Sequence, residues 1–171
     1  MNNLFCKDYE RFTPDANTLI KRTLRLIKNY DLRVLWVLRK YQSAEGWTQV
    51  IWKILLNRYK RKFGIELLCK NIGGGVRLIH PYGITVNANA HVGKNVTLFK
   101  GVTIGEIEKG KRKGNPCIED GVTIYANATI CGNVCIGKNS IIASGAFVNF
   151  NVPQDSIVIG NPGVIHKKQK E

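Results

Sequence analysis

Three histidines and five cysteines are the side chains of this chain best suited to proton transfer or nucleophilic attack. The imidazole of histidine titrates near neutral pH, so a well-placed histidine can remove the proton of a hydroxyl group as that group attacks an electrophile. His91 falls at an outward position of a repeat, and His166 lies near the end of the sequence. His80 is the remaining histidine, but residue type alone does not assign it a role, because a lone histidine without a motif is more often structural.

The cysteines indicate unpaired thiols rather than a disulfide framework or a metal centre. Their number is odd, and none of them forms a Cys-x-x-Cys pair. Disulfide scaffolds usually have an even number of cysteines, and zinc sites usually have closely spaced pairs. No Cys/His motif supports a cysteine nucleophile either, so we expect no acyl-enzyme and no bound metal.

A period of six residues governs the chain from about residue 65 onward. Apolar side chains stand six positions apart in two phased runs: Val86, Val92, Leu98 and Ile104, then Ile118, Ile124, Ile130, Ile136, Ile142 and Val148. Neither a helix nor a hairpin has this period, whereas a coil of short strands and tight turns does. Asparagine and glycine at the corners accept left-handed turn conformations. The sequence predicts a mainly β protein, a parallel β-helix of hexapeptide repeats over residues 65–163.

The phase of this repeat breaks once. Ile104 and Ile118 are fourteen residues apart, two more than two repeats, and the segment GEIEKGKRKGNP between them has no core pattern. Loops that leave a regular scaffold often carry function. We therefore expect an active-site loop at about residues 105–116; a tolerated surface insertion is the alternative.

A small helical region is predicted for residues 1–64. Thr13-Pro14-Asp15 is typical of a helix start, Asp31 is placed to cap a second helix, and a third is expected from about Trp47 to Lys62. Residues 1–65 carry 14 Lys and Arg against 5 Asp and Glu, which is +9 of the total charge of +14. A solvated basic face is the favoured explanation, and peripheral contact with an anionic membrane is the alternative.

Other classes of protein are disfavoured by composition. No apolar run approaches the roughly 20 residues of a membrane-spanning helix, and the first residues lack the order of a secretion signal. No nucleic-acid-binding module is recognisable, so we expect no nucleic-acid partner. The predicted location is cytoplasmic, with the inner face of the membrane as an extension of that prediction. Residues 164–171 are expected to form a basic C-terminal tail.

Four motifs resemble those of one family. They are His80-Pro-Tyr-Gly-Ile-Thr-Val, Gly101-Val-Thr-Ile-Gly, Asn115-Pro-Cys-Ile-Glu-Asp-Gly-Val and Gly160-Asn-Pro-Gly. Together they resemble the serine acetyltransferase branch of the hexapeptide-repeat acyltransferases, which includes O-acetyltransferases of capsule and exopolysaccharide gene clusters. The resemblance implies a left-handed β-helix, acetyl-CoA as co-substrate, and homotrimers with active sites between neighbouring subunits. It also implies direct transfer of acetyl to an acceptor hydroxyl, with His80 as general base.

The resemblance also implies where coenzyme A would lie. Small residues at Ala126, Ser144 and Gly145 would let its pantetheine arm run along the coils. Gly160, Asn161 and Pro162 form the family's motif at the end of the β-helix, near coenzyme A. Lys167 is a candidate contact for the phosphates of coenzyme A, with a solvated basic tail as the alternative.

Departures from the family pattern decide which acceptor the sequence favours. Serine acetyltransferases carry charged groups for the ammonium and carboxylate of serine at three positions that here hold Ile79, Gly114 and Asn115. The acid that orients the catalytic histidine is replaced by Ile65; the neighbouring Glu66 is a candidate substitute, although a shift of one residue on a strand faces it the other way. A sugar hydroxyl would not need charged partners.

Three functions follow from this sequence. The first is O-acetylation of a sugar in a surface polysaccharide or its precursor, which makes a carbohydrate the acceptor. The second is serine O-acetylation for cysteine biosynthesis. The third is a non-catalytic β-helix that serves as a scaffold, which an intact His80 and loop argue against.

Overall fold

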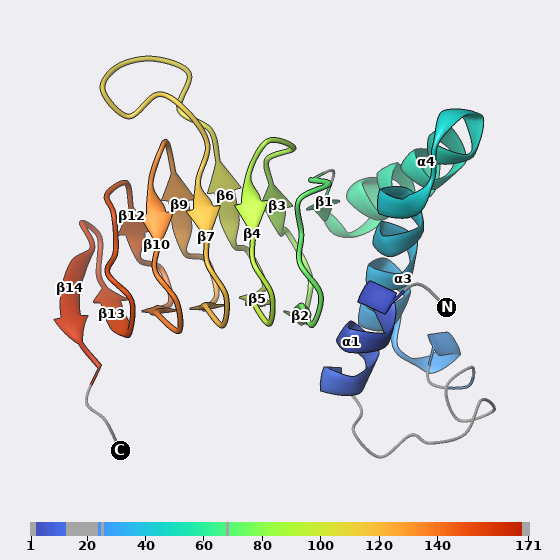
Figure 1. Ribbon diagram of the computed structural model, residues 1–171, viewed down its shortest axis with the longest axis horizontal. Coiled ribbons are helices and arrows are strands. Elements are labelled where there is room, and N and C mark those ends of the chain that lie inside the picture. Colours follow the sequence, from blue (N-terminus) through green and yellow to red (C-terminus); the bar gives the residue numbers. More distant parts are fainter. Residues whose placement is uncertain (1–2, 13–23, 25, 68, 169–171) are drawn as a thin grey trace.

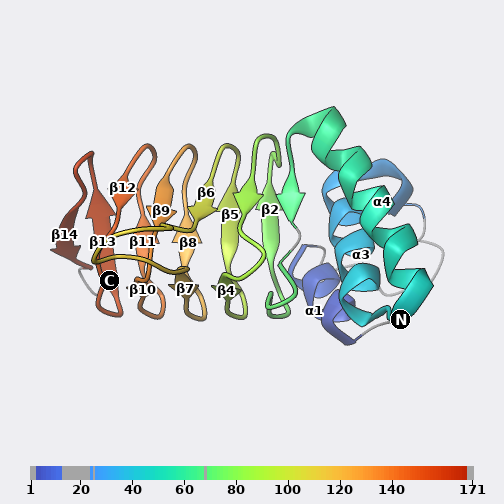
Figure 2. The same cartoon turned by 90° about the horizontal axis from the view of Figure 1, so that it is seen from above.

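The computed structural model describes residues 3–12, 24, 26–67 and 69–168 of the 171-residue chain. A parallel β-helix makes up most of the molecule, and the helices cover the end of it where the first coil begins (Figure 1). Figure 2 shows the same arrangement from above, with α3 and α4 side by side.

Three sheets form the sides of the β-helix. The five-stranded sheet contains β1 (Glu66–Leu67), β3 (Thr85–Val86), β6 (Thr103–Gly105), β9 (Thr129–Cys131) and β12 (Phe147–Val148). The three-stranded sheet contains β4 (His91–Val92), β7 (Cys117–Ile118) and β10 (Cys135–Ile136). The six-stranded sheet contains β2 (Arg77–Ile79), β5 (Thr97–Phe99), β8 (Thr123–Ile124), β11 (Ile141–Ile142), β13 (Ser156–Ile159) and β14 (Val164–Lys167).

The predicted period of six is confirmed by the core. All ten apolar residues at the sixth positions are buried, from Val86 to Val148. In the ladders each one lies beside its counterpart in the next coil, as Val86 does beside Ile104 and Ile104 beside Ile130. Branched aliphatic side chains therefore form continuous stacks inside the prism, and their removal from water is the main stabilising contribution of the fold.

Asparagine and glycine stack at the corners between strands. Asn95, Asn127 and Asn139 adopt left-handed backbone conformations, with φ of 57°, 60° and 57°. At Gly101, whose φ is 70°, a Cβ atom would come within 2.0 Å of the Asn127 Oδ1 atom of the next coil. Glycine is therefore required there for two reasons, because the conformation and the space both exclude a side chain.

Three helices are described in full: α1 (Asn3–Phe12), α3 (Tyr30–Ser43) and α4 (Gly46–Phe63). The predicted third helix matches α4 to within one residue at each end. The prediction that Asp31 caps the second helix is wrong: Asn29 occupies the capping position without a side-chain hydrogen bond, and Asp31 lies in the first turn. The predicted helix start at Thr13-Pro14-Asp15 lies outside the described residues.

Two further observations concern the edges of the molecule. Residues 164–167, predicted as part of a tail, form β14, which pairs antiparallel with β13 because Val164 and Ile165 follow a tight turn. On α4, Trp47, Val50, Ile51 and Ile54 are exposed. In the described part of the chain no helix has the length and apolar character needed to span a membrane. Peripheral contact with a membrane stays a prediction.

A buried ion pair joins the helices to the first coil. The Arg39 side chain on α3 donates hydrogen bonds from Nε to Asp8 Oδ2 at 2.7 Å and from Nη2 to Asp8 Oδ1 at 2.9 Å. Asp8, on α1, also accepts from the Val76 backbone N–H at 2.9 Å, and Arg39 Nη1 donates to the Ile72 carbonyl at 2.6 Å. Both side chains are almost fully buried, so each charge depends on these partners.

We expect Asp8→Ala to lower the free energy of unfolding by about 3–5 kcal/mol, because it leaves the Arg39 guanidinium buried without its carboxylate. The matched control is Lys60→Ala, which removes the exposed Lys60–Glu66 pair and should cost less than about 1 kcal/mol. Urea denaturation followed by circular dichroism measures both. Equal losses in the two variants would contradict the importance given to the buried pair.

Candidate active site

His80 lies at the corner between β2 and β3, exposed to solvent. Its φ of 48° is unusual for a residue other than glycine, and such conformations persist only where surrounding contacts hold them. Here the Tyr82 N–H donates to the His80 carbonyl at 2.7 Å, and the Gly83 N–H donates to the Phe63 carbonyl at 2.9 Å. The conformation of this turn is thus held by one hydrogen bond within the turn and by a second one to the end of α4.

The N-terminal turn of α3 packs against this corner. The Tyr30 hydroxyl donates a hydrogen bond to the Pro81 carbonyl. The Tyr30 ring centroid lies 4.6 Å from that of Phe63 and 5.8 Å from that of Tyr82, and Phe63 and Tyr82 meet edge to face at 5.5 Å. These three rings hold the residues that follow His80, so the position of the candidate base depends on the helical region.

Asp31 is the acid whose charge interacts with His80. Burial raises the pKa of the Asp31 carboxyl group, and the positive charge of His80 opposes that rise. Glu66, the candidate from the sequence, pairs instead with Lys60 at 2.7 Å. Across the described residues we find no hydrogen bond from Glu66 to His80. The local sequence contains no signal for the nearness of Asp31, because it results from the docking of α3 on the β-helix.

One edge of the β-helix unites His80 with most of the predicted coenzyme-binding residues. This His80 edge consists of the corners at residues 80–84, 100–102, 125–128, 143–146 and 160–163, where the chain leaves the six-stranded sheet. Backbone hydrogen bonds link successive corners, from Gly101 N to the Tyr82 carbonyl at 2.7 Å and from Gly145 N to the Ala126 carbonyl at 2.9 Å. Ala126, Ser144, Gly145, Gly160, Asn161 and Pro162 all lie on this edge.

The sequence prediction missed an aromatic pair on the same edge. Phe99 and Tyr125 stack with ring centroids 4.7 Å apart, between the His80 corner and Ser144. Each ring directly follows a sixth-position residue, so the phase of the repeat was the signal that could have found them. Lys167 lies elsewhere: it is opposite Ser156, at the far end of the β13–β14 pair from Gly160.

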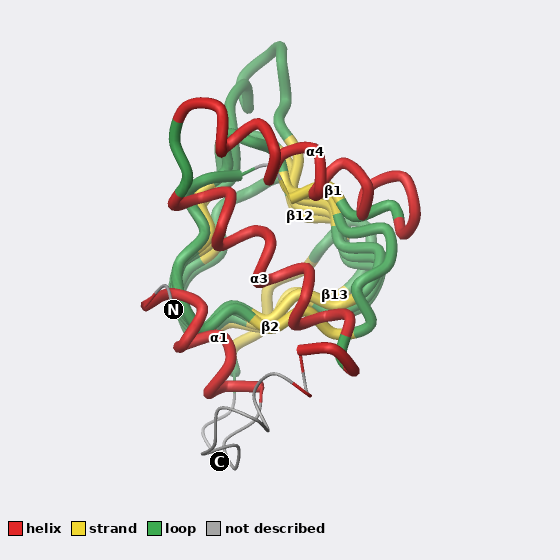
Figure 3. Tube along the Cα trace, turned by 90° about the vertical axis from the view of Figure 1, so that its right-hand side faces the viewer, coloured by secondary structure: helices red, strands yellow, loops and turns green. Residues whose placement is uncertain are grey.

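The predicted loop leaves the β-helix at a different corner. Residues 105–116 connect β6 to β7, and Figure 3, which looks along the axis of the β-helix, shows the loop projecting away from its coils. Ile107 and Gly114 form a bridge at its base, with N–O distances of 3.1 and 2.9 Å. Asn115 Oδ1 is buried and has no hydrogen-bond partner. Within one chain Ile79 therefore adjoins His80, whereas Gly114 and Asn115 do not.

One thiol of the β-helix, that of Cys135, is poorly suited to nucleophilic attack. Cys117 and Cys135 are neighbours in the ladder of β7 and β10. Burial, followed by the neighbouring Cys117 and Glu119, raises the pKa of Cys135 to about 11. A thiol attacks as the thiolate, so the raised pKa disfavours Cys135 as a nucleophile. Among the described residues, no three His, Cys, Asp or Glu side chains converge in a way that could hold a metal ion.

Comparison with known proteins gives consistent results. The family model described as bacterial transferase hexapeptide (six repeats) matches residues 118–149. A serine acetyltransferase of Staphylococcus xylosus is 37% identical over 171 residues, which cover 95% of this chain and 79% of that protein. Serine acetyltransferase 2 of Arabidopsis thaliana is 34% identical over 118 residues, 68% of this chain. The chain spans only 36% of that plant protein and 51% of the Bacillus subtilis serine acetyltransferase, which is 36% identical.

Solved structures agree on the fold. The serine acetyltransferase from Brucella abortus strain S19 has a TM-score of 0.76 and 26% identity, and the match covers 98% of this chain and 69% of that one. The same protein in complex with coenzyme A gives a TM-score of 0.77 at 24% identity, over 98% of this chain and 68% of that one. From its sequence identity, its repeats and its fold, this chain belongs to the serine acetyltransferase family of hexapeptide-repeat transferases, which have a left-handed β-helix.

Proposed function

We propose that this chain is an O-acetyltransferase that moves the acetyl group of acetyl-CoA to an acceptor hydroxyl, with His80 as general base. The observation that carries the proposal is the 37% identity to the Staphylococcus xylosus serine acetyltransferase over 95% of this chain. The exposed position of His80 on an edge shared with Ala126 and Gly145 supports it, because base and coenzyme must meet at the thioester.

The chemistry of the step is direct transfer. His80 removes the proton of the acceptor hydroxyl as the hydroxyl oxygen attacks the thioester carbonyl. The protonated imidazole then gives this proton to the departing thiolate, so coenzyme A leaves as a thiol. The tetrahedral oxyanion requires hydrogen-bond donors, a role for which backbone N–H groups are suited. A covalent intermediate on Cys135 is disfavoured by its raised pKa.

The relatives are serine acetyltransferases, and this favours serine as the acceptor over the sugar of a surface polysaccharide, which the residues of the sequence alone favoured. A sugar hydroxyl remains the second candidate because of a specific observation. Serine is a zwitterion whose ammonium and carboxylate need charged or strongly polar partners when they leave water. Ile79, beside His80, offers an apolar side chain, and Gly114 at the base of the loop has none.

We expect His80→Ala to lower kcat by about 10²–10⁴-fold, because the acceptor loses its base. Thiol release from acetyl-CoA, measured with serine and with a panel of sugars and oligosaccharides, tests the base and the acceptor together. Turnover on serine identifies a serine acetyltransferase, and turnover only on a glycan identifies the second candidate. Binding of acetyl-CoA without turnover on any acceptor would instead indicate a non-catalytic scaffold.

Asp31, rather than Glu66, is proposed to position the imidazole of His80. Asp31→Asn should lower kcat on the order of tenfold or more, because the carboxylate no longer stabilises the protonated imidazole. Glu66→Gln is the matched control and should leave kcat within about twofold, since it breaks only the partly exposed ion pair with Lys60. Steady-state kinetics and a urea midpoint for each variant separate this role from a loss of stability. A larger effect from Glu66→Gln would reverse the assignment.

A homotrimer is proposed to complete the site. In one chain the loop with Gly114 and Asn115 leaves from a different corner than the one that carries His80. A neighbouring copy could supply the loop to that edge, which would give Asn115 Oδ1 a partner. Light scattering should then report a mass of about 58 kDa, three times 19.2 kDa. A mass near 19 kDa for the active protein would contradict the proposal.

A further inference from the structure

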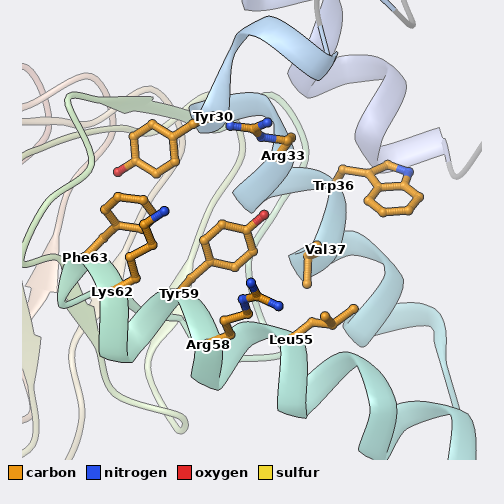
Figure 4. Close-up of a pocket in the computed structure, with 9 residues that line it drawn as sticks. All are labelled: Tyr30, Arg33, Trp36, Val37, Leu55, Arg58, Tyr59, Lys62 and Phe63. Atoms are coloured by element: carbon orange, nitrogen blue, oxygen red, sulfur yellow. The ribbon is translucent and has the colours of Figure 1, made fainter.

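A cavity of about 400 Å³ opens between α3 and α4, on the side of the helices that adjoins the His80 corner. Its volume lies within the range of small-molecule sites. The residues that line it are Tyr30, Arg33, Trp36, Val37, Leu55, Arg58, Tyr59, Lys62 and Phe63 (Figure 4). No acidic residue is among them, so the cavity combines aromatic walls with a purely positive charge.

Three cations surround this cavity. Arg33 comes from α3, and Arg58 and Lys62 come from successive turns of α4. In the described ranges the ion pairs are Asp8–Arg39 and Lys60–Glu66, so these three cations have no carboxylate partner there. Arg33 Nη1 donates to the Ile27 carbonyl at 2.9 Å. Like charges placed together without an acid repel one another, and a bound anion would convert that repulsion into charge-assisted hydrogen bonds.

The walls suit a ring. Figure 4 shows the Tyr59 ring between the guanidinium groups of Arg33 and Arg58, with Tyr30 and Phe63 at the end nearer the β-helix. Tyr59 and Phe63 lie 6.2 Å apart at an interplanar angle of 23°, so their faces are nearly parallel. Aromatic faces of this kind bind the apolar faces of sugars and the rings of bases. The occupant is therefore expected to carry a ring as well as an anionic group.

The cavity shares its walls with the His80 corner. Tyr30 lines the cavity and donates through its hydroxyl to the Pro81 carbonyl, next to His80. Phe63 also lines it and packs against Tyr82. A molecule whose anionic group lies among Arg33, Arg58 and Lys62 can therefore extend toward His80 along Tyr30. Binding energy from the anionic group, remote from the reaction, would then be used to orient a hydroxyl group for attack.

We propose that this cavity binds the diphosphate of an acceptor in which a sugar is linked to a nucleoside or to a lipid. This inference rests on the proposed acetyl transfer for its role, and it makes the second acceptor candidate a phosphorylated sugar. Diphosphate matches the three cations in charge, and the aromatic faces match the attached ring. Serine provides neither group.

The test is calorimetric titration of the whole chain with inorganic pyrophosphate at about 150 mM salt, where long-range attraction is screened. Arg58→Gln/Lys62→Gln should weaken binding by roughly tenfold or more, because two charge-assisted contacts are lost. The control Lys53→Gln/Lys94→Gln removes two exposed charges outside the cavity and should leave binding unchanged. No binding to the unmodified chain, or equal weakening in both double variants, would overturn the proposal.

Two further titrations identify the source of the diphosphate. One uses uridine diphosphate N-acetylglucosamine, and the other uses prenyl-diphosphate-linked N-acetylglucosamine in detergent micelles. Tighter binding of either compound than of pyrophosphate, lost in Arg58→Gln/Lys62→Gln, supports the proposal and names the carrier; tighter binding of neither overturns it. His80→Ala should bind both compounds normally. If the unmodified chain transfers acetyl to serine but does not bind pyrophosphate, this inference is refuted while the proposed function is upheld.

Discussion

Every coil of this protein must direct a side chain into the interior at each sixth residue, so that each of the three sheets adds one residue to its own stack. Because Val86, Ile104, Ile130 and Val148 follow one another in a single ladder, an insertion within a strand would turn the following residues to the wrong face. The chain can therefore add residues only at corners. The loop at residues 105–116 obeys this constraint: it leaves after β6 and closes through the Ile107–Gly114 bridge before β7 resumes the stack.

The same constraint restricts reactive side chains to the corners of the β-helix and to its open end. Interior positions accept only apolar or small side chains, and even the buried Ser140 has its hydroxyl bonded to the Pro153 carbonyl at 2.8 Å. Reactive groups must lie at corners, as His80 does, or on elements packed against the coils. The open end of the β-helix supplies the second place. There the Asp8–Arg39 pair fastens α1 and α3 to the first coil, and the same docking brings Tyr30 and Asp31 to the His80 corner.

The difference between these two places explains how much the sequence could predict. The period of six determines which residues are interior and which lie at corners, so the β-helix and the loop follow from counting, whereas the roles of His80, Ala126 and Gly160 came from the family resemblance. The nearness of Asp31 to His80 follows from neither, because it depends on the angle at which α3 packs. The place of Lys167 could not be predicted for a related reason: a polar tail gives no periodic signal, and the antiparallel pairing of β14 with β13 puts the lysine at the far end of that pair from Gly160.

The acceptor is the point on which family and residues differ. Identity of 37% to a serine acetyltransferase shows the family, and a shared fold constrains the acceptor less than it constrains the scaffold. An acceptor is recognised by the few groups around the base. Here these are the apolar Ile79 beside His80, the Asp31 carboxyl group that interacts with His80 and, through Tyr30, a cavity lined by three cations. The three cations of this cavity attract phosphates, and this attraction is the electrostatic basis of the anionic acceptor proposed above for the scaffold of a serine acetyltransferase.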